Sequence, residues 1–163
     1  THIEKLVVFI NHKYRNTTWS PVIYQYRSLS YEELIALYSI SDVALITPLR
    51  DSMNLIAKEF LATKWEKEGA LILSEMAGAA DELSEAIIID PNNLEEISHS
   101  LNYCLQMSKE EQSLRISAMQ ARLIFYDIFK WSDDFLTCLR KTQKKPVSIG
   151  YQQSYPQAKS YLQ

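Results

Sequence analysis

Three short, nearly uninterrupted apolar runs alternate with helical patterns along this chain. The runs occupy residues 42–46, 70–73 and 86–89. Runs of this kind are typical of strands that a parallel sheet buries on both faces, and parallel neighbours need a crossover connection, usually a helix. The alternation therefore predicts an α/β fold with a parallel sheet flanked by helices.

The other segments complete this pattern. The composition of residues 22–26 predicts a further strand. Residues 3–13 fit a strand by their β-branched run and a helix by their apolar spacing of three and four, and we favour the helix. Ser-x-x-Glu capping boxes at Ser30 and Ser108 indicate two helix starts. Helices are expected over 3–13, 33–40, 53–64, 77–83, 94–105, 108–129 and 131–139.

The chain has 163 residues, which is enough for one domain, and we see no internal repeat. We assign residues 1–141 to that domain. Residues 142–163 are rich in Gln, Ser, Lys and Tyr without any period, so we expect a flexible tail there. Because the chain starts at Thr1 without a methionine, we expect it to be part of a longer polypeptide.

Composition and charge argue against several classes of protein. The net charge of −3 lacks the basic footprint of a general nucleic-acid binder. No apolar run approaches the roughly 18 residues of a membrane span. The two cysteines and three histidines share no metal-ligand spacing, so we expect no metal, and a reduced, cytoplasmic setting. Three glycines are too few for a dinucleotide or P-loop fingerprint.

The end of the first apolar run is the most informative place for a site. In an open parallel sheet, ligands bind outside the carboxyl ends of the strands. The first run ends at Thr47 and a helix is expected from about Met53. Backbone N–H groups of residues 53–56 would be free at that helix start, where the helix dipole also favours a phosphate.

Two carboxylates flank this helix start. Asp51 precedes it and suits a neutral polyol, because a carboxylate accepts hydrogen bonds from two hydroxyls. Glu59 lies four residues after Leu55, near the same face, and could accept bonds from a diol such as ribose. Together they predict a nucleotide-sugar site. The alternatives are that Asp51 or Ser52 only caps the helix and that Glu59 is a solvated charge.

Two long motifs resemble one family. SDVALITPLRDSMNLIAKEFLA (41–62) and GALILSEMAGAADELSEAIIIDPNN (69–93) resemble the donor-binding segments of trehalose-6-phosphate synthases, in the bacterial form. The similarity runs from about Ile10 to Leu139 and includes INHKY, WSPVIY, MQARL and WSDDFL. Glucosylglycerol-phosphate synthases share most of these motifs.

The resemblance implies a retaining glucosyltransferase of the two-domain GT-B type, of which this chain would be part of the C-terminal, Rossmann-like half. The reaction would move glucose from UDP-glucose to glucose 6-phosphate, by a front-face displacement and without a metal or other cofactor. The partners would be these two substrates and the missing N-terminal half of the same chain, and a homo-oligomer is compatible with it.

The resemblance also assigns donor-binding roles to seven residues. The catalytic residue would be Asp51, which holds hydroxyls of the donor glucose. The other roles are those of the Met53 and Asn54 amides near the glucose, the Leu55 and Ile56 amides on the diphosphate, Glu59 on the ribose, and Leu34 beside the uracil.

The chain departs from the family pattern in two respects. Ser52 stands where the family has the glycine of D-G-M-N-L, which puts donor affinity in question. The family's diphosphate-binding arginine and lysine, and the first two strands of this half, precede the matched region. We therefore expect the chain alone to be unstable, or poorly packed around Val22 to Tyr26. A non-catalytic regulatory or interaction module and a glucosylglycerol-phosphate synthase are the alternative functions.

Overall fold

A three-stranded parallel sheet forms the centre of the molecule. The computed structural model describes residues 1–143. Its strands are β1 (Val43–Ile46), β2 (Ala70–Ser74) and β3 (Ile87–Ile89), in the spatial order β1-β2-β3. Val43 is in register with Ala70, and Ile72 with Ile87. The predicted parallel α/β fold is confirmed.

Helices cover both faces of this sheet. On one face, α2 (Tyr31–Ile40), α3 (Leu55–Thr63), α4 (Ala79–Glu82) and α6 (Lys109–Phe125) surround a core that includes the fully buried Phe60 and Leu73. On the other face, α5 (Leu94–Gln106) packs over Ile72 and Ile89. Every residue of β2 is buried, as expected of a central strand. β1 is one of the two edge strands, and its Leu45 is 42% exposed, so the expectation of burial on both faces fails there.

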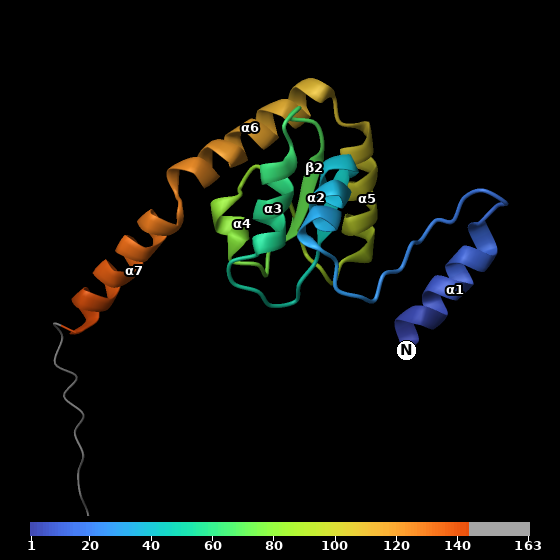
Figure 1. Cartoon of the computed structure of the whole chain (residues 1–163), viewed down its shortest axis with the longest axis horizontal. Helices are drawn as coiled ribbons and strands as arrows, with labels where there is room; N and C mark the ends of the chain where they lie inside the picture. The colour runs from blue at the N-terminus through green and yellow to red at the C-terminus, as the bar shows by residue number, and fades with distance from the viewer. Residues whose placement is uncertain (144–163) are drawn as a thin grey trace, which may run out of the picture.

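Two helical arms extend from this packed unit on opposite sides (Figure 1). α1 (His2–Tyr14) has a complete capping box from Thr1 and Glu4 but contains no buried residue. α7 (Ile128–Gln143) follows α6 and projects away from the sheet. Across residues 1–143, no helix is long and apolar enough to cross a membrane.

The strand predicted over 22–26 is wrong. These residues form an extended segment without a neighbouring strand. The Asn11 side chain supplies its hydrogen bonds instead, since it donates to the Val22 carbonyl at 2.9 Å and accepts from the Val22 amide at 3.0 Å. Ile23 and Tyr26 are 81% and 87% exposed, which agrees with the poor packing expected there.

Most helix predictions are confirmed, with changes at the ends. Residues 3–13 are helical, and Ser30 and Glu33 form the predicted capping box. Ser108 caps α6, but the Glu111 carboxylate bonds Tyr103 and Arg115 instead of completing the box. The helix predicted to reach 129 ends at Phe125, and the next begins at Ile128. The predicted boundary at 141–142 falls within α7, and the rest of the predicted tail lies outside the described residues.

Candidate functional site

The loop after β1 lies against the loop after β2, at the carboxyl edge of the sheet. The Asp51 amide donates to the Met76 carbonyl at 3.3 Å, and the Gly78 amide donates to the Asp51 carbonyl at 3.2 Å. The Ala79 amide adds a bond to the Ser52 carbonyl at 3.0 Å. Gly78 permits this contact, because a Cβ there would lie 2.9 Å from the Ser52 carbonyl oxygen. Backbone bonds therefore fix the position of the segment that carries Asp51.

The Asp51 carboxylate has a hydrogen-bond donor on each oxygen. Oδ1 accepts from the Ser52 amide at 2.7 Å, and Oδ2 accepts from Asn54 Nδ2 at 2.6 Å. Asp51 is exposed and Asn54 is buried. An exposed carboxylate keeps acceptor capacity for further hydroxyl donors, because each oxygen can accept two bonds.

The cap of α3 is Asn54, so the alternative that Asp51 or Ser52 caps this helix is wrong. Asn54 Oδ1 accepts from the Ala57 amide at 2.9 Å. Asparagine is among the best N-cap residues because its side-chain oxygen reaches the amides of the first turn. The helix accordingly begins at Leu55, two residues later than predicted.

The start of α3 presents free backbone donors to solvent. Leu55 and Ile56 occupy its first two positions, where the helix itself provides no acceptor for the N–H groups. Both residues are at least half exposed. Met53 and Asn54 precede the helix, so only Leu55 and Ile56 supply free amides of the first turn. An anion at this end would also gain from the helix dipole.

Glu59 on α3 contacts the neighbouring helix α2 through Tyr38. Glu59 is exposed on α3 and accepts a long hydrogen bond, 3.4 Å, from the hydroxyl of Tyr38 on α2. Burial, and then the charge of Glu59, raise the pKa of Tyr38. Leu34 is half-buried one turn before Tyr38, on the same face of α2. Leu34 and Tyr38 thus lie on one face of α2, and Tyr38 contacts Glu59.

Ser52 fits its loop without backbone strain. Within residues 1–143, Lys67 is the only residue other than glycine with a positive φ. Ser52 is exposed and uses its backbone amide and carbonyl to bond Asp51 and Ala79. The replacement of glycine by serine is therefore compatible with the observed loop.

Side chains of the MQARL segment on α6 fix the helices behind the site. Gln120 donates to the carbonyls of Leu61 and Lys64 at the end of α3, at 2.6 and 3.0 Å. Arg122 donates to the Glu82 carbonyl at the end of α4 and pairs with the Glu85 carboxylate at 2.5 and 2.7 Å. This bidentate pair raises the pKa of Arg122 and lowers that of Glu85.

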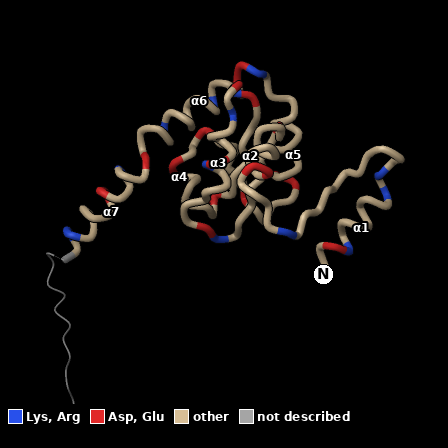
Figure 2. Tube along the Cα trace, viewed as in Figure 1, with Lys and Arg blue, Asp and Glu red and all other residues tan. Residues whose placement is uncertain are grey.

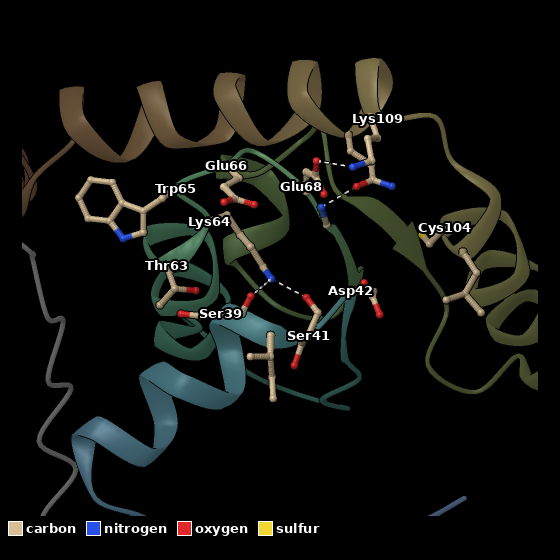
Figure 3. A pocket seen from close by; sticks show the side chains of 14 residues that line it. Ser39, Ser41, Asp42, Thr63, Lys64, Trp65, Glu66, Glu68, Cys104 and Lys109 are labelled. Carbon is tan, nitrogen blue, oxygen red and sulfur yellow. Dashed lines mark hydrogen bonds and ion pairs between the residues drawn. The ribbon is translucent and has the colours of Figure 1, made fainter.

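A hollow of about 620 Å³ lies at the opposite edge of the sheet, below the starts of β1 and β2 (Figure 3). The buried Lys64 side chain extends into it and donates to the carbonyls of Ser39 and Ser41. Burial lowers the pKa of Lys64. Lys109 pairs with Glu68 at 2.7 Å at its rim. Lys64 thus caps the end of α2, and Lys109 and Glu68 pair with each other.

Charged residues are spread along the described part of the chain. Lys and Arg are dispersed from α1 to the end of α7 (Figure 2). In the part of the chain that the structure describes, no group of three His, Cys, Asp or Glu residues could hold a metal ion.

Three features of the site escape the sequence patterns. The first is the double contact of Asn54, which a D-x-x-N spacing before an apolar helix could have indicated. The second is the close approach of Gly78 to Ser52, which depends on a contact between loops 26 residues apart. The Tyr38–Glu59 contact is a third such pairing between separate helices.

Comparison with known proteins identifies the family. Residues 1–141 match glycosyltransferase family 20. A bifunctional trehalose-6-phosphate synthase/phosphatase of Thermoproteus tenax is 48% identical over 137 residues, which cover 84% of this chain and 19% of that protein. A glucosylglycerol-phosphate synthase of Synechocystis is 42% identical over 134 residues, which cover 82% of this chain and 27% of that protein.

A solved structure agrees with this match. The E. coli trehalose-6-phosphate protein bound with UDP-2-fluoro glucose superposes with a TM-score of 0.79 at 36% identity. The match covers 85% of this chain and 31% of that one, so this chain spans about a third of the solved protein. With a family match over nearly the whole described chain and the same fold, this chain belongs to glycosyltransferase family 20.

Proposed function

We propose that this chain forms the donor-binding part of a retaining glucosyltransferase that moves glucose from UDP-glucose to glucose 6-phosphate and so makes trehalose 6-phosphate. The observation that carries this proposal is the position of Asp51 beside the start of α3. An exposed carboxylate that can accept hydroxyl bonds and two free helix amides that can hold phosphate lie within five residues of one another.

Each predicted residue is assigned a role in donor binding, and the geometry supports those of Asp51, Leu55 and Ile56. Asp51, the proposed catalytic residue, accepts bonds from hydroxyls of the donor glucose. The diphosphate lies against the Leu55 and Ile56 amides, and Glu59 accepts bonds from the ribose. The remaining predicted contacts are those of the Met53 and Asn54 backbones with the glucose and of Leu34 with the uracil.

The relatives support a UDP-linked glucose donor. The solved E. coli protein is bound with UDP-2-fluoro glucose, and the Thermoproteus relative is named a synthase of trehalose 6-phosphate. The chain spans 19–31% of these proteins. The basic groups for the diphosphate would then come from the part of the complete enzyme that precedes the matched region, and the contacts with the acceptor from its other half. No metal is part of the proposed chemistry.

A second acceptor is favoured by one observation. The Synechocystis relative, at 42% identity, is named a glucosylglycerol-phosphate synthase. Glycerol 3-phosphate would then replace glucose 6-phosphate, while the donor site described here would serve both reactions unchanged.

The test is the release of UDP from UDP-glucose by the complete polypeptide that contains this chain, with each acceptor in turn. We expect Asp51→Ala to lower turnover by at least about 100-fold, a size typical of losing a group that orients the substrate. Asp81→Ala, an exposed change on α4, is the matched control and should leave turnover unchanged. Near-native turnover of the Asp51 variant would contradict the proposed site, and an inactive natural protein that still binds UDP would support the non-catalytic alternative.

A further inference from the structure

The amide side chain of Asn54 joins the two parts of the proposed donor site. Its oxygen accepts from the Ala57 amide at 2.9 Å, and its nitrogen donates to Asp51 Oδ2 at 2.6 Å. Asn54 is only 6% exposed. The side chain therefore sits between the carboxylate and the helix start and contacts both.

The two contacts depend on each other. The oxygen of the amide is committed to the cap, so the nitrogen on its other side faces Asp51. A hydrogen bond to a charged acceptor is stronger than one between neutral groups, and the short distance agrees with this. The Ser52 amide holds the other carboxylate oxygen at 2.7 Å. The carboxylate thus accepts a hydrogen bond at each oxygen. One of the two donors belongs to Asn54, the N-cap residue of α3.

We propose that Asn54 is a positioning residue that orients the Asp51 carboxylate relative to the free amides of α3, so that the glucose and the diphosphate of one donor molecule are held in the right relation. This inference rests on the proposed function. It adds a role for the Asn54 side chain, separate from the backbone contact assigned to that residue.

A cap alone does not require asparagine. Serine and aspartate cap helices about as well, but neither has an N–H to donate. Asn54→Ser therefore keeps the cap acceptor and removes the Nδ2–H donor, since the serine hydroxyl lies one bond closer to the backbone and farther from Asp51. The chain also contains a matched control, because Asn93 caps α5 by accepting from the Glu96 amide at 3.2 Å. Asn93→Ser makes the same chemical change at a cap away from Asp51.

The experiment compares binding of UDP and of UDP-glucose to the complete polypeptide by calorimetry, without acceptor. UDP reports the diphosphate and ribose contacts, and the additional affinity for UDP-glucose reports the glucose contacts. We expect Asn54→Ser to weaken UDP-glucose by about 10-fold or more while UDP changes by less than about 2-fold, because misplacing one orienting group can cost up to about 100-fold. Asn93→Ser should change neither affinity.

The double variant tests whether Asn54 acts through Asp51. Asp51→Ala alone should also weaken UDP-glucose selectively, and adding Asn54→Ser should weaken it no further, since residues in one network are not additive. Equal loss of both ligands in Asn54→Ser, or no loss of either, would overturn the positioning role. If Asn54→Ser does not fold, the uncharged Asn54→Thr also keeps a cap acceptor without the amide donor and should show the same selective loss. A natural protein that binds neither ligand would instead refute the proposed function.

Discussion

The packed unit from α2 to α6 and the two arms α1 and α7 use apolar residues in different ways. Phe60 in the packed unit is fully buried, whereas Phe9 in α1 is 63% exposed. In α7, Trp131 and Phe135 stack with ring centroids 5.5 Å apart, yet Phe135 is 54% exposed. Both arms are nevertheless regular helices. The comparison shows that capping and helical spacing suffice to form a helix here, whereas burial requires a partner surface.

The largest difference in unfolding free energy is expected when phenylalanine is replaced by alanine once in the packed unit and once in an arm. Phe60→Ala should lower the free energy of unfolding by about 3–5 kcal/mol, because it leaves a cavity in the core. Phe9→Ala should change it by no more than about 0.5 kcal/mol, as is usual for exposed sites. Urea denaturation of the chain, followed by circular dichroism, measures both. Similar losses for the two variants would show that α1 packs on the sheet in solution.

A smaller effect is expected where a polar side chain ties the packed unit together. Gln120→Leu leaves the carbonyls of Leu61 and Lys64 without this donor and should cost about 1–3 kcal/mol of unfolding free energy. Gln106→Leu is the control, because the exposed Gln106 side chain donates to Asn102 on its own helix. The same denaturation experiment compares the two. An equal cost would mean that α6 does not fix the end of α3.

A more local effect is expected at the contact between the loop after β1 and the loop after β2. Gly78→Ala places a methyl group 2.9 Å from the Ser52 carbonyl oxygen, so the loop that carries Asp51 has to move. We expect a cost of about 1 kcal/mol, at the low end for overpacking, since the loop can shift. Amide NMR shifts should change in residues 51–54 and 76–79. Glu75→Ala, in the same loop and exposed, is the control, and unchanged shifts at 51–54 in the Gly78 variant would contradict the contact.

The same difference between regions explains what the sequence could predict. The three strands of the packed unit are apolar and bounded by turn residues, so pattern and propensity agree with the fold. Residues 22–26 have strand composition as well, but a strand also needs a neighbour to bond, and Asn11 takes that place. Strand propensity is a property of one segment. Whether the segment forms a strand also depends on whether another segment pairs with it.

The site divides in a similar way. Asp51, Leu55, Ile56 and Glu59 follow from the rule that ligands bind beyond strand ends and at helix starts. The alternative in which Asp51 or Ser52 caps α3 is wrong by two to three residues, because Asn54 also has a capping side chain and is the cap. Asn54 differs from a simple cap residue because its side-chain nitrogen also donates a hydrogen bond to Asp51. That contact is visible only in three dimensions.

The smallest expected effect concerns the point where the N-terminal arm joins the packed unit. Arg27 pairs with Glu33 at 2.7 Å, and this pair, followed by the Ser30 amide, lowers the pKa of Glu33 from 4.5 to about 2. Because the folded pKa is depressed, the pair's contribution to stability is present above about pH 4.5 and is lost as the pH falls towards 2. Arg27→Gln should raise the pKa of Glu33 without restoring its ordinary value, since the Ser30 amide still donates. Arg15→Gln, at the other end of the same segment, should leave it unchanged. A side-chain carbon NMR titration measures both, and an unchanged pKa in the Arg27 variant would show that the capping box alone holds this junction.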